Sequence, residues 1–213
     1  MDIASIIDHT LLRPDATEKM IEKLCAEAAE YHFYSVCVNP VWVPFCKEFL
    51  DFETPLVCSV AGFPLGASPM VAGEAEWAVA RGADEVDMVL PVGLLKQGDT
   101  AEVLRIIHEV VTEVPGIPVK VILETCLLTD DEKITACSIS KDAGAAFVKT
   151  STGFSKGGAT VPDIRLMRKT VGSLMGVKAS GGVRDFNTAI AMVKAGASRI
   201  GTSGSITIVN GNK

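Results

Sequence analysis

The sequence predicts an α/β protein, a single (β/α)8 TIM barrel domain spanning residues 1–213, and three observations favour this fold. Strand-like apolar runs alternate with amphipathic helical stretches eight times, with no linker or low-complexity segment between them. The runs are apolar on both faces, as strands of a parallel sheet covered by helices are. The 213 residues are 48% apolar, enough for one buried core at the short end of the range for this barrel.

The predicted strands are runs rich in β-branched and apolar residues, at 5–12, 34–39, 56–62, 85–90, 119–125, 146–152, 176–181 and 198–203. Four of the intervening helices are clear from their spacing: one that begins after Thr17 as its N-cap, and three over 101–114, 130–143 and 185–195. An open doubly wound sheet usually has fewer strands, so the closed barrel is favoured. Functional groups of such a barrel lie at the carboxyl ends of its strands.

Composition excludes several function classes. The net charge is -6 and no long basic run is present, so a nucleic-acid partner is not expected. The N-terminus has no leader pattern and no apolar segment approaches membrane-spanning length, which predicts a cytoplasmic protein without a membrane partner. Six cysteines lack a C-x-x-C pair and three histidines lack metal-ligand spacing. We therefore expect reduced core thiols, no metal site and no cofactor.

Two lysines lie inside predicted buried strands, Lys149 in the sixth and Lys178 in the seventh. An isolated charge in a protein interior is costly, so such positions point to chemistry. Adjacent strands lie roughly 4.8 Å apart, so we expect the two ammonium groups to suppress each other's charge. A neutral lysine is a nucleophile that attacks carbonyl groups and forms a Schiff base. The pair therefore predicts a Schiff-base enzyme.

Acidic residues accompany these lysines. Asp87 is expected to point into the barrel, either as an acid/base that relays protons through water between the lysines or as a buried ion-pair partner, and the residues leave both roles open. Asp8 has the same ambiguity, and we expect it to support and orient Lys178. Lys120 and Glu124 are expected on one face of the fifth strand, where a structural ion-pair layer is favoured over a direct role.

Glycine-bearing loops follow the last three strands, with the sequences STGFSKGGAT, SGGVRD and GTSGS. Glycine lets backbone amides approach an anion closely, and a helix that starts after such a loop adds its positive end. Loops after the seventh and eighth strands form the recurrent phosphate site of these barrels, although left-handed turns without a ligand are the plainer interpretation of any single loop. We therefore expect a substrate that carries a phosphate.

The sequence resembles the deoxyribose-phosphate aldolase family, class I aldolases of deoxyribonucleotide catabolism. The segments that carry the resemblance run in register along the whole chain: IDHTLLRPDAT, SVCVNP, VAGFPLG, GADEVDMV, KVILET, FVKTSTGF, VKASGGVR and RIGTSG. It implies reversible cleavage of 2-deoxy-D-ribose 5-phosphate to acetaldehyde and D-glyceraldehyde 3-phosphate. Some members use a C-terminal tyrosine, but both tyrosines here lie far upstream, so proton transfer by the tail is not expected. A homodimer is the family expectation.

By this resemblance Lys149 is the Schiff-base lysine, Lys178 the lysine that perturbs it and shares in proton transfer, and Asp87 the relay carboxylate. The residues that match the family's phosphate-binding positions are Gly153, Gly181, Gly182, Ser203 and Gly204. Two other classes stay open. One is another phosphate-binding Schiff-base aldolase or a sugar-phosphate isomerase, and the other is a non-catalytic barrel that binds sugar phosphates.

Overall fold

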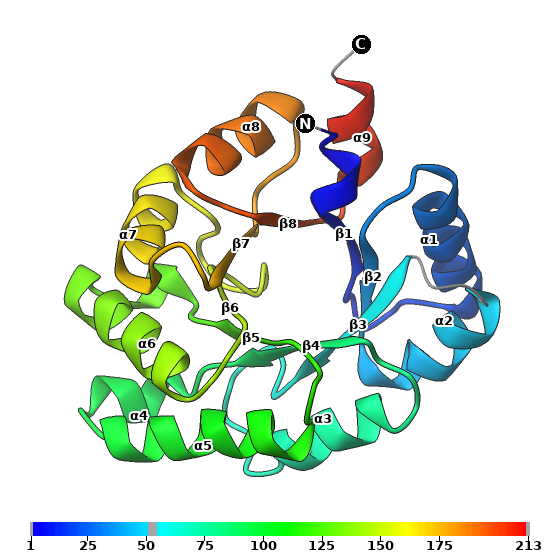
Figure 1. The fold of residues 1–213 in the computed structure, drawn as a ribbon. Coiled ribbons are helices and arrows are strands. Elements are labelled where there is room, and N and C mark those ends of the chain that lie inside the picture. The colour runs from blue at the N-terminus through cyan, green and yellow to red at the C-terminus, as the bar shows by residue number, and fades with distance from the viewer. Residues whose placement is uncertain (1, 51–54, 212–213) are drawn as a thin grey trace.

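Eight parallel strands close into a barrel in the computed structural model, which describes residues 2–50 and 55–211 (Figure 1). Each strand pairs with the next along the chain, and β8 pairs with β1 to close the sheet. The strands that the structure describes are β1 (Ile7–Leu11), β2 (Ser35–Val38), β3 (Leu56–Ala61), β4 (Glu85–Val89), β5 (Val119–Ile122), β6 (Phe147–Lys149), β7 (Gly176–Ser180) and β8 (Arg199–Thr202). The predicted (β/α)8 fold is confirmed.

Every predicted strand contains one observed strand, but the observed strands are shorter. The difference is largest for β6, which was predicted to continue to residue 152 and ends at Lys149. Beyond that residue the chain still bonds to its neighbours, since Thr150 donates its backbone N–H to Lys178 O at 3.1 Å. It then turns at Gly153, whose φ of 84° is a left-handed value that glycine adopts without strain. The end of β6 therefore opens into a loop directly above Lys149.

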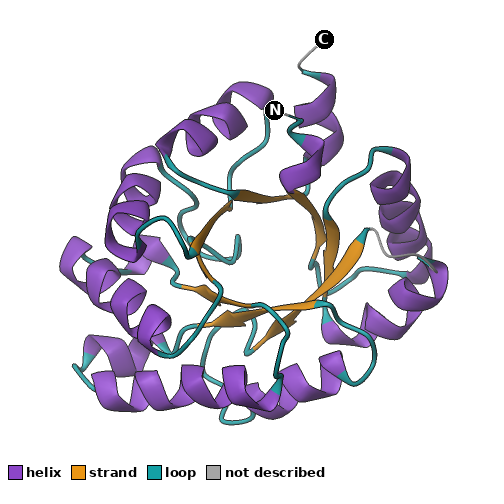
Figure 2. Ribbon diagram, viewed as in Figure 1, coloured by secondary structure: helices purple, strands orange, loops and turns teal. Residues whose placement is uncertain are grey.

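Helices surround the barrel on its outer side (Figure 2). They are α1 (Glu18–Glu30), α2 (Val43–Phe49), α3 (Val71–Val79), α4 (Val92–Lys96), α5 (Thr100–Glu113), α6 (Asp130–Asp142), α7 (Val161–Val171), α8 (Phe186–Ala195) and α9 (Ser205–Asn210), with 3-10 turns at Ala4–Ile6, Pro40–Trp42 and Thr125–Leu127. The start of α6 is fixed by a capping box in which Thr129 and Glu132 satisfy each other's backbone amides. Thr17 precedes α1 as predicted, but its side chain makes no capping hydrogen bond.

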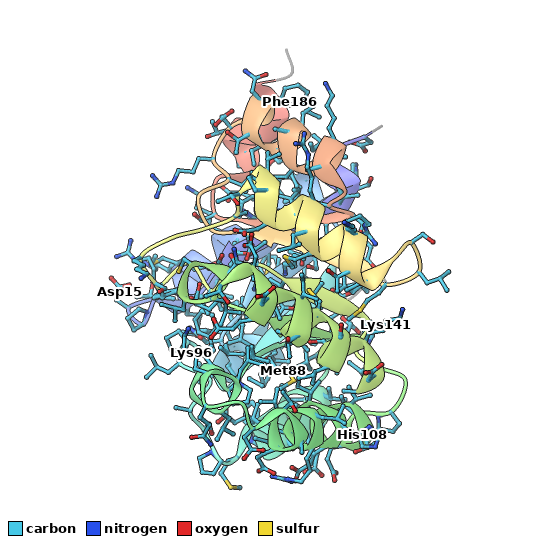
Figure 3. All side chains as sticks on the ribbon, turned by 90° about the vertical axis from the view of Figure 1, so that its left-hand side faces the viewer. Asp15, Met88, Lys96, His108, Lys141 and Phe186 are labelled. Atoms are coloured by element: carbon cyan, nitrogen blue, oxygen red, sulfur yellow. The ribbon has the colours of Figure 1, made fainter. Side chains whose placement is uncertain are left out.

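The hydrophobic core lies between the helices and the outer face of the barrel. On α1, for example, the buried residues are Ile21, Leu24, Cys25 and Ala28, one face of the helix. Met88 on β4 is fully buried, whereas Lys96 and Lys141 project into solvent from α4 and α6 (Figure 3). None of the helices in the described part of the chain is long and apolar enough to cross a membrane. The barrel interior differs from this core, because Lys120 and Lys178 are among its largest fully buried side chains.

Candidate active site

A pocket of about 360 Å³ opens at the carboxyl ends of β1, β6, β7 and β8. Lys149 is the last residue of β6, Ser180 the last of β7 and Thr202 the last of β8, and all three line the pocket. Backbone and side chains of the loops that follow these strands form the rest of the wall. The pocket therefore occupies the end of the barrel where functional groups of this fold gather.

Lys149 and Lys178 lie side by side, as the sequence predicts. Their Cα atoms are direct partners in the pairing of β6 with β7. Lys178 is fully buried, and the side chain of Lys149 is 3% exposed but reaches the pocket. Gly201 on β8 leaves room for Lys178, because a Cβ atom there would lie 2.8 Å from Lys178 Cε.

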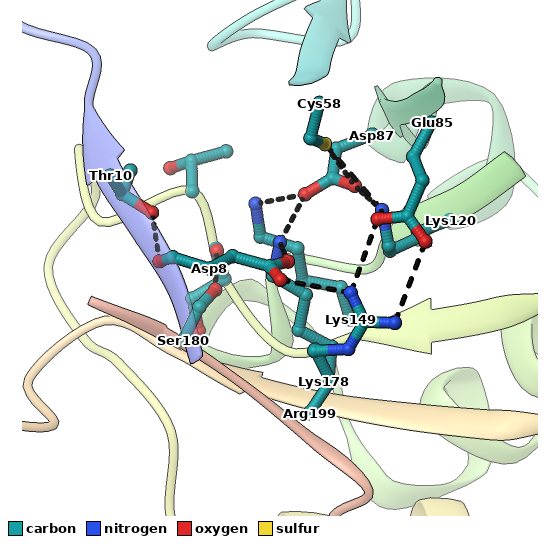
Figure 4. Close-up of polar contacts among 12 residues, drawn as sticks. Asp8, Thr10, Cys58, Glu85, Asp87, Lys120, Lys149, Lys178, Ser180 and Arg199 are labelled. Carbon is teal, nitrogen blue, oxygen red and sulfur yellow. Dashed lines mark hydrogen bonds and ion pairs between the residues drawn. The ribbon is translucent and has the colours of Figure 1, made fainter. Parts of the chain in front are cut away.

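Asp87 joins the two lysines directly (Figure 4). Its Oδ2 lies 2.8 Å from the Nζ atoms of both Lys149 and Lys178, so no water separates them as the relay interpretation assumed. Its Oδ1 lies 2.8 Å from Lys120 Nζ and accepts a hydrogen bond from Cys58 Sγ at 3.2 Å. Burial opposes its charge, but the lysines outweigh burial and hold the pKa of Asp87 well below its usual range. Asp87 is therefore an anion that bridges three lysine amines.

Asp8 holds Lys178 from the other side, as expected. It contacts Lys178 Nζ through Oδ2 and Arg199 Nη1 through Oδ1, the latter at 2.9 Å. Burial raises the pKa of Asp8, yet Lys178 and Arg199 together lower it to about 2. Burial likewise opposes the charge on Lys178, but Asp8 and Asp87 raise its pKa above the ordinary lysine value. The expectation that the two lysines suppress each other is therefore wrong for Lys178, which keeps its proton.

Lys120, Glu85 and Arg199 continue this network toward the amino-terminal end of the barrel. Lys120 Nζ lies 2.7 Å from Glu85 Oε2, and the same oxygen lies 3.1 Å from Arg199 Nη1. The Arg199 guanidinium also stacks on the Tyr34 ring, 3.3 Å from its centroid. Burial opposes the charge on Lys120, but Asp87 and Glu85 raise its pKa well above the usual value. The predicted ion-pair layer thus contains Lys120.

Glu124 does not belong to that layer, contrary to the expectation. β5 ends at Ile122, and Glu124 follows in the left-handed region with φ of 54°. Its buried carboxylate accepts hydrogen bonds from the hydroxyl and the backbone N–H of Thr152. Glu124 therefore fixes the loop after β6. The alternation rule fails here because it applies only while the chain stays in the strand.

The barrel ions form a closed ring of alternating charge, with one lysine outside it. Six groups alternate in the order Asp87, Lys178, Asp8, Arg199, Glu85 and Lys120, and each contacts its two neighbours. Three cations and three carboxylates make this ring neutral. Among the described residues, Lys149 contacts one carboxylate, Asp87, which the ring already shares between two other lysines. Of the four buried cations, Lys149 is therefore the one whose charge is least compensated, and it is the one that lines the pocket.

Four of the five predicted phosphate-binding residues line the pocket: Gly153, Gly181, Gly182 and Ser203. The fifth, Gly204, does not, because its backbone N–H donates to Thr202 Oγ1 at 2.9 Å within the same loop. The loops after β6 and β7 are packed together. Ala159 donates its backbone N–H to Gly181 O at 2.9 Å, and a Cβ atom at Gly158 would lie 2.3 Å from the same oxygen.

The contribution of helix ends to anion binding, expected from the sequence, stays a prediction. At the start of α8, Asp185 accepts hydrogen bonds from the Thr188 backbone N–H and hydroxyl, so a carboxylate already occupies that position. The helix after β8 is a single short piece, Ser205–Asn210. The pocket wall also contains Arg184 and Arg13. Sequence reasoning missed Arg184 as a candidate anion ligand, although the SGGVRD motif contains it.

A small apolar cluster beside the ion network contains two cysteines, one of which contacts Lys120 and Asp87. Cys37 and Cys58 are register partners on β2 and β3 and cluster with Leu12 and Val60. In the described part of the chain, the one group of metal-type ligands within reach of each other is Cys37, Cys58 and Asp87. Asp87 already contacts three lysine amines, and the charges of Lys120 and Lys178 repel a metal cation. Spacing along the sequence could not reveal this group, because its members lie on three strands.

Comparison with known proteins gives consistent results. The family model described as DeoC/LacD family aldolase matches residues 3–210. The chain is 60% identical to a deoxyribose-phosphate aldolase of Brevibacillus brevis, covering 100% of this chain and 97% of the relative. It is 57% identical to the corresponding enzyme of Thermococcus gammatolerans, covering 99% and 96%.

Solved structures agree with the family match. An aldolase called QR15 superposes with a TM-score of 0.95 at 40% identity, covering 99% of this chain and 95% of that one. A tetrameric deoxyribose phosphate aldolase from Aeropyrum pernix superposes with a TM-score of 0.86 at 37% identity, covering 98% and 89%.

Proposed function

This chain belongs to the DeoC/LacD family of aldolases, and from that premise we propose that it is a class I aldolase of deoxyribonucleotide catabolism. Its proposed reaction is the reversible cleavage of 2-deoxy-D-ribose 5-phosphate to acetaldehyde and D-glyceraldehyde 3-phosphate. One observation carries the assignment of roles. The pocket is lined by a single barrel lysine, Lys149, which stands outside a neutral ring of ions.

Lys149 is the proposed nucleophile. With every group ionised, the buried network has one net positive charge, and loss of one proton from Lys149 makes the network neutral. A low-dielectric interior favours that neutral state. The other amines keep their protons, because Lys120 and Lys178 each contact two carboxylates. Carbonyl attack requires a free amine, and this charge balance favours Lys149 as the residue that provides it.

In the direction of cleavage, the proposed reaction starts from this neutral amine. Neutral Lys149 attacks the C1 aldehyde of the open-chain sugar, and loss of water leaves a protonated imine that draws electrons toward nitrogen. A base removes the proton of the C3 hydroxyl, the C2–C3 bond breaks, and its electron pair forms an enamine on Lys149. Glyceraldehyde 3-phosphate leaves. Protonation of the enamine at its terminal carbon and hydrolysis then release acetaldehyde and restore the amine.

Lys178 and Asp87 are the proposed proton-transfer groups. They contact each other, and both lie next to Lys149, where the imine forms. Gly153, Gly181, Gly182 and Ser203 are the proposed phosphate ligands, with Arg184 as the nearby cation. Holding the phosphate fixes C3 relative to the imine, so binding energy at the far end of the substrate is used for orientation at the reacting bond.

Borohydride trapping tests the proposal directly. We incubate the protein with acetaldehyde and sodium borohydride, digest it and locate the modified residue by mass spectrometry. The expected result is an ethyl group on Lys149, and no adduct on this residue in the Lys149→Met variant. An isomerase or a non-catalytic sugar-phosphate binding barrel predicts no adduct on the parent protein. Binding of 2-deoxyribose 5-phosphate without trapping or turnover would therefore contradict the aldolase assignment.

The proposal also covers the domain organisation, cellular location, partner molecule and oligomeric state. We propose one catalytic domain over residues 1–213, a cytoplasmic location and a phosphosugar as the partner molecule. A homodimer is proposed from the family resemblance, although the Aeropyrum pernix relative is described as a tetramer. Light scattering coupled to size-exclusion chromatography distinguishes a dimer from a monomer or a tetramer.

A further inference from the structure

Glu85 and Arg199 are buried charged residues to which the aldolase mechanism assigns no step. Glu85 is the first residue of β4 and Arg199 the first residue of β8, so both lie toward the amino-terminal end of the barrel. Neither lines the substrate pocket. A purely structural ion pair could serve here, but burying two charges is costly and apolar residues of similar size often stabilise as well. Their position in the ring of ions suggests a different reason for their presence.

We propose that Glu85 and Arg199 are positioning residues that set the protonation state of Lys149 through the ring of ions, without touching the substrate. The proposal rests on Lys149 being the Schiff-base nucleophile. Arg199 Nη1 lies 2.9 Å from Asp8 Oδ1 and 3.1 Å from Glu85 Oε2, so it closes the ring by linking Asp8 to Glu85. Glu85 reaches Lys149 through Lys120 and Asp87, and Arg199 reaches it through Asp8, Lys178 and Asp87.

The ring is neutral when both residues are charged. Without the carboxylate of Glu85 it has an excess positive charge, so Lys149 loses its proton more easily. Without the guanidinium of Arg199 it has an excess negative charge, so Lys149 retains its proton to a higher pH. Removal of both returns the ring to neutrality. The two residues therefore act with opposite sign on one amine, and their effects cancel in combination.

Other titratable groups around these residues do not change the sign. Lys149 faces Asp87 and its register partner Lys178. Cys58 donates to Asp87 and packs beside Lys120, and Cys37 on β2 is its neighbour.

Arg199 also faces the Tyr34 ring, 3.3 Å from its centroid. Two charges roughly 8 Å apart, at an effective dielectric constant of about 20, shift one another's ionisation by roughly one to two pH units. An effect of that size is measurable in a pH profile.

The experiment compares Glu85→Gln, Arg199→Gln and the double variant with the parent enzyme. For each we measure kcat/KM against pH and, independently, the pH dependence of borohydride trapping with acetaldehyde, which requires the free amine. We expect the midpoint of the acidic limb to move down by about one unit in Glu85→Gln and up by about one unit in Arg199→Gln. In the double variant it returns to within about half a unit of the parent value.

Controls separate this role from a structural one. Glu102→Gln removes a carboxylate that pairs with Arg105 on the surface, 2.7 Å away, and we expect no shift of the midpoint. Arg199→Lys retains the charge, so it restores the midpoint even where it lowers the overall rate. Urea unfolding shows whether each variant is folded and how stable it is. If one single variant does not fold, the other single variant and the charge-balanced double variant still give signed predictions.

Three outcomes would overturn the inference: midpoints that stay fixed while rates fall, single variants that shift in the same direction, or a double variant that shifts further than either single. These outcomes differ from failure of the proposed function. If the parent enzyme forms no imine with acetaldehyde, the aldolase assignment itself is wrong. If it forms one with unchanged midpoints in all variants, only the role of Glu85 and Arg199 is wrong.

Discussion

Gly158 offers a direct test of the proposed phosphate site, because it packs backbone against backbone. A Cβ atom at this position would lie 2.3 Å from Gly181 O and 3.2 Å from Gly181 Cα. Non-bonded carbon and oxygen need about 3.5 Å, so Gly158→Ala forces a displacement of about 1 Å. No rotamer change can relieve this contact, because the backbone fixes the Cβ position and the atoms it meets are main chain. We expect the hydrogen bond from Ala159 N–H to Gly181 O to break and the Gly181–Gly182 segment to move.

The assay compares 2-deoxyribose 5-phosphate with unphosphorylated 2-deoxyribose. A displacement of about 1 Å at a positioning group can cost up to 10²-fold in rate, so we expect kcat/KM for the phosphosugar to fall about 10-fold or more. For the unphosphorylated sugar we expect less than about a twofold change, because Lys149 lies on β6 and not in the displaced segment. Gly93→Ala is the matched control, since no atom lies within 4 Å of a Cβ there. Equal losses on both sugars, or no loss on either, would refute the assignment of this loop to phosphate binding.

Three other substitutions test the lysine cluster and the ring. Lys178→Leu should lower kcat by orders of magnitude and KM far less, because it removes a proton-transfer group and leaves the phosphate loops intact; the same activity as the parent from pH 6 to 9 would contradict this. Gly201→Ala should lower kcat about 10-fold or more, since its Cβ would lie 2.8 Å from Lys178 Cε, and a crystal structure of the variant should show the Nζ displaced from Asp87. Asp8→Asn tests acid stability. The pKa of Asp8 is about 2 in the folded protein and near 3.8 in the unfolded chain, so its contribution is present above pH 4 and is lost as the pH falls toward 2. This amounts to about 2 kcal/mol in the free energy of unfolding. Urea unfolding from pH 5 to 2 should therefore show a smaller acid-dependent loss in Asp8→Asn than in the parent, and identical slopes would contradict the assignment.

Periodicity predicted the barrel and most of its elements because each buried strand is apolar on both faces and each helix on one. The same reasoning placed Lys149 and Lys178 next to each other, since their positions at the ends of consecutive strands bring them into register. It failed for Glu124, because the strand ends at Ile122 and the chain then adopts a left-handed conformation that no alternation rule covers.

The ring of ions could not be predicted from local patterns. Arg199 and Asp8 are separated by most of the chain and meet because β8 pairs with β1 when the barrel closes. Glu85 shares strand parity with Asp87, which predicts an inward side chain but gives no partner. For Gly204, by contrast, the motif indicates a role in phosphate binding but does not show the contacts of its backbone. It matches a phosphate-binding position, yet its N–H is already bonded to Thr202 Oγ1, and only the folded loop reveals that.

A buried nucleophilic lysine must not destabilise the fold, and it must also be able to give up its proton. The odd number of buried cations in the barrel reconciles these two requirements. Without any partner, a buried lysine would destabilise the fold whenever it was protonated. With two carboxylate partners, as Lys178 and Lys120 have, it keeps its proton and cannot attack a carbonyl. Lys149 has one contact, to an anion whose charge is shared with two other lysines, so its position is fixed while its charge is the least compensated in the network. Because the ring is neutral without Lys149, substitutions that preserve ring charge should change the rate mainly through geometry. Substitutions that alter ring charge should also change the pH at which the enzyme becomes active.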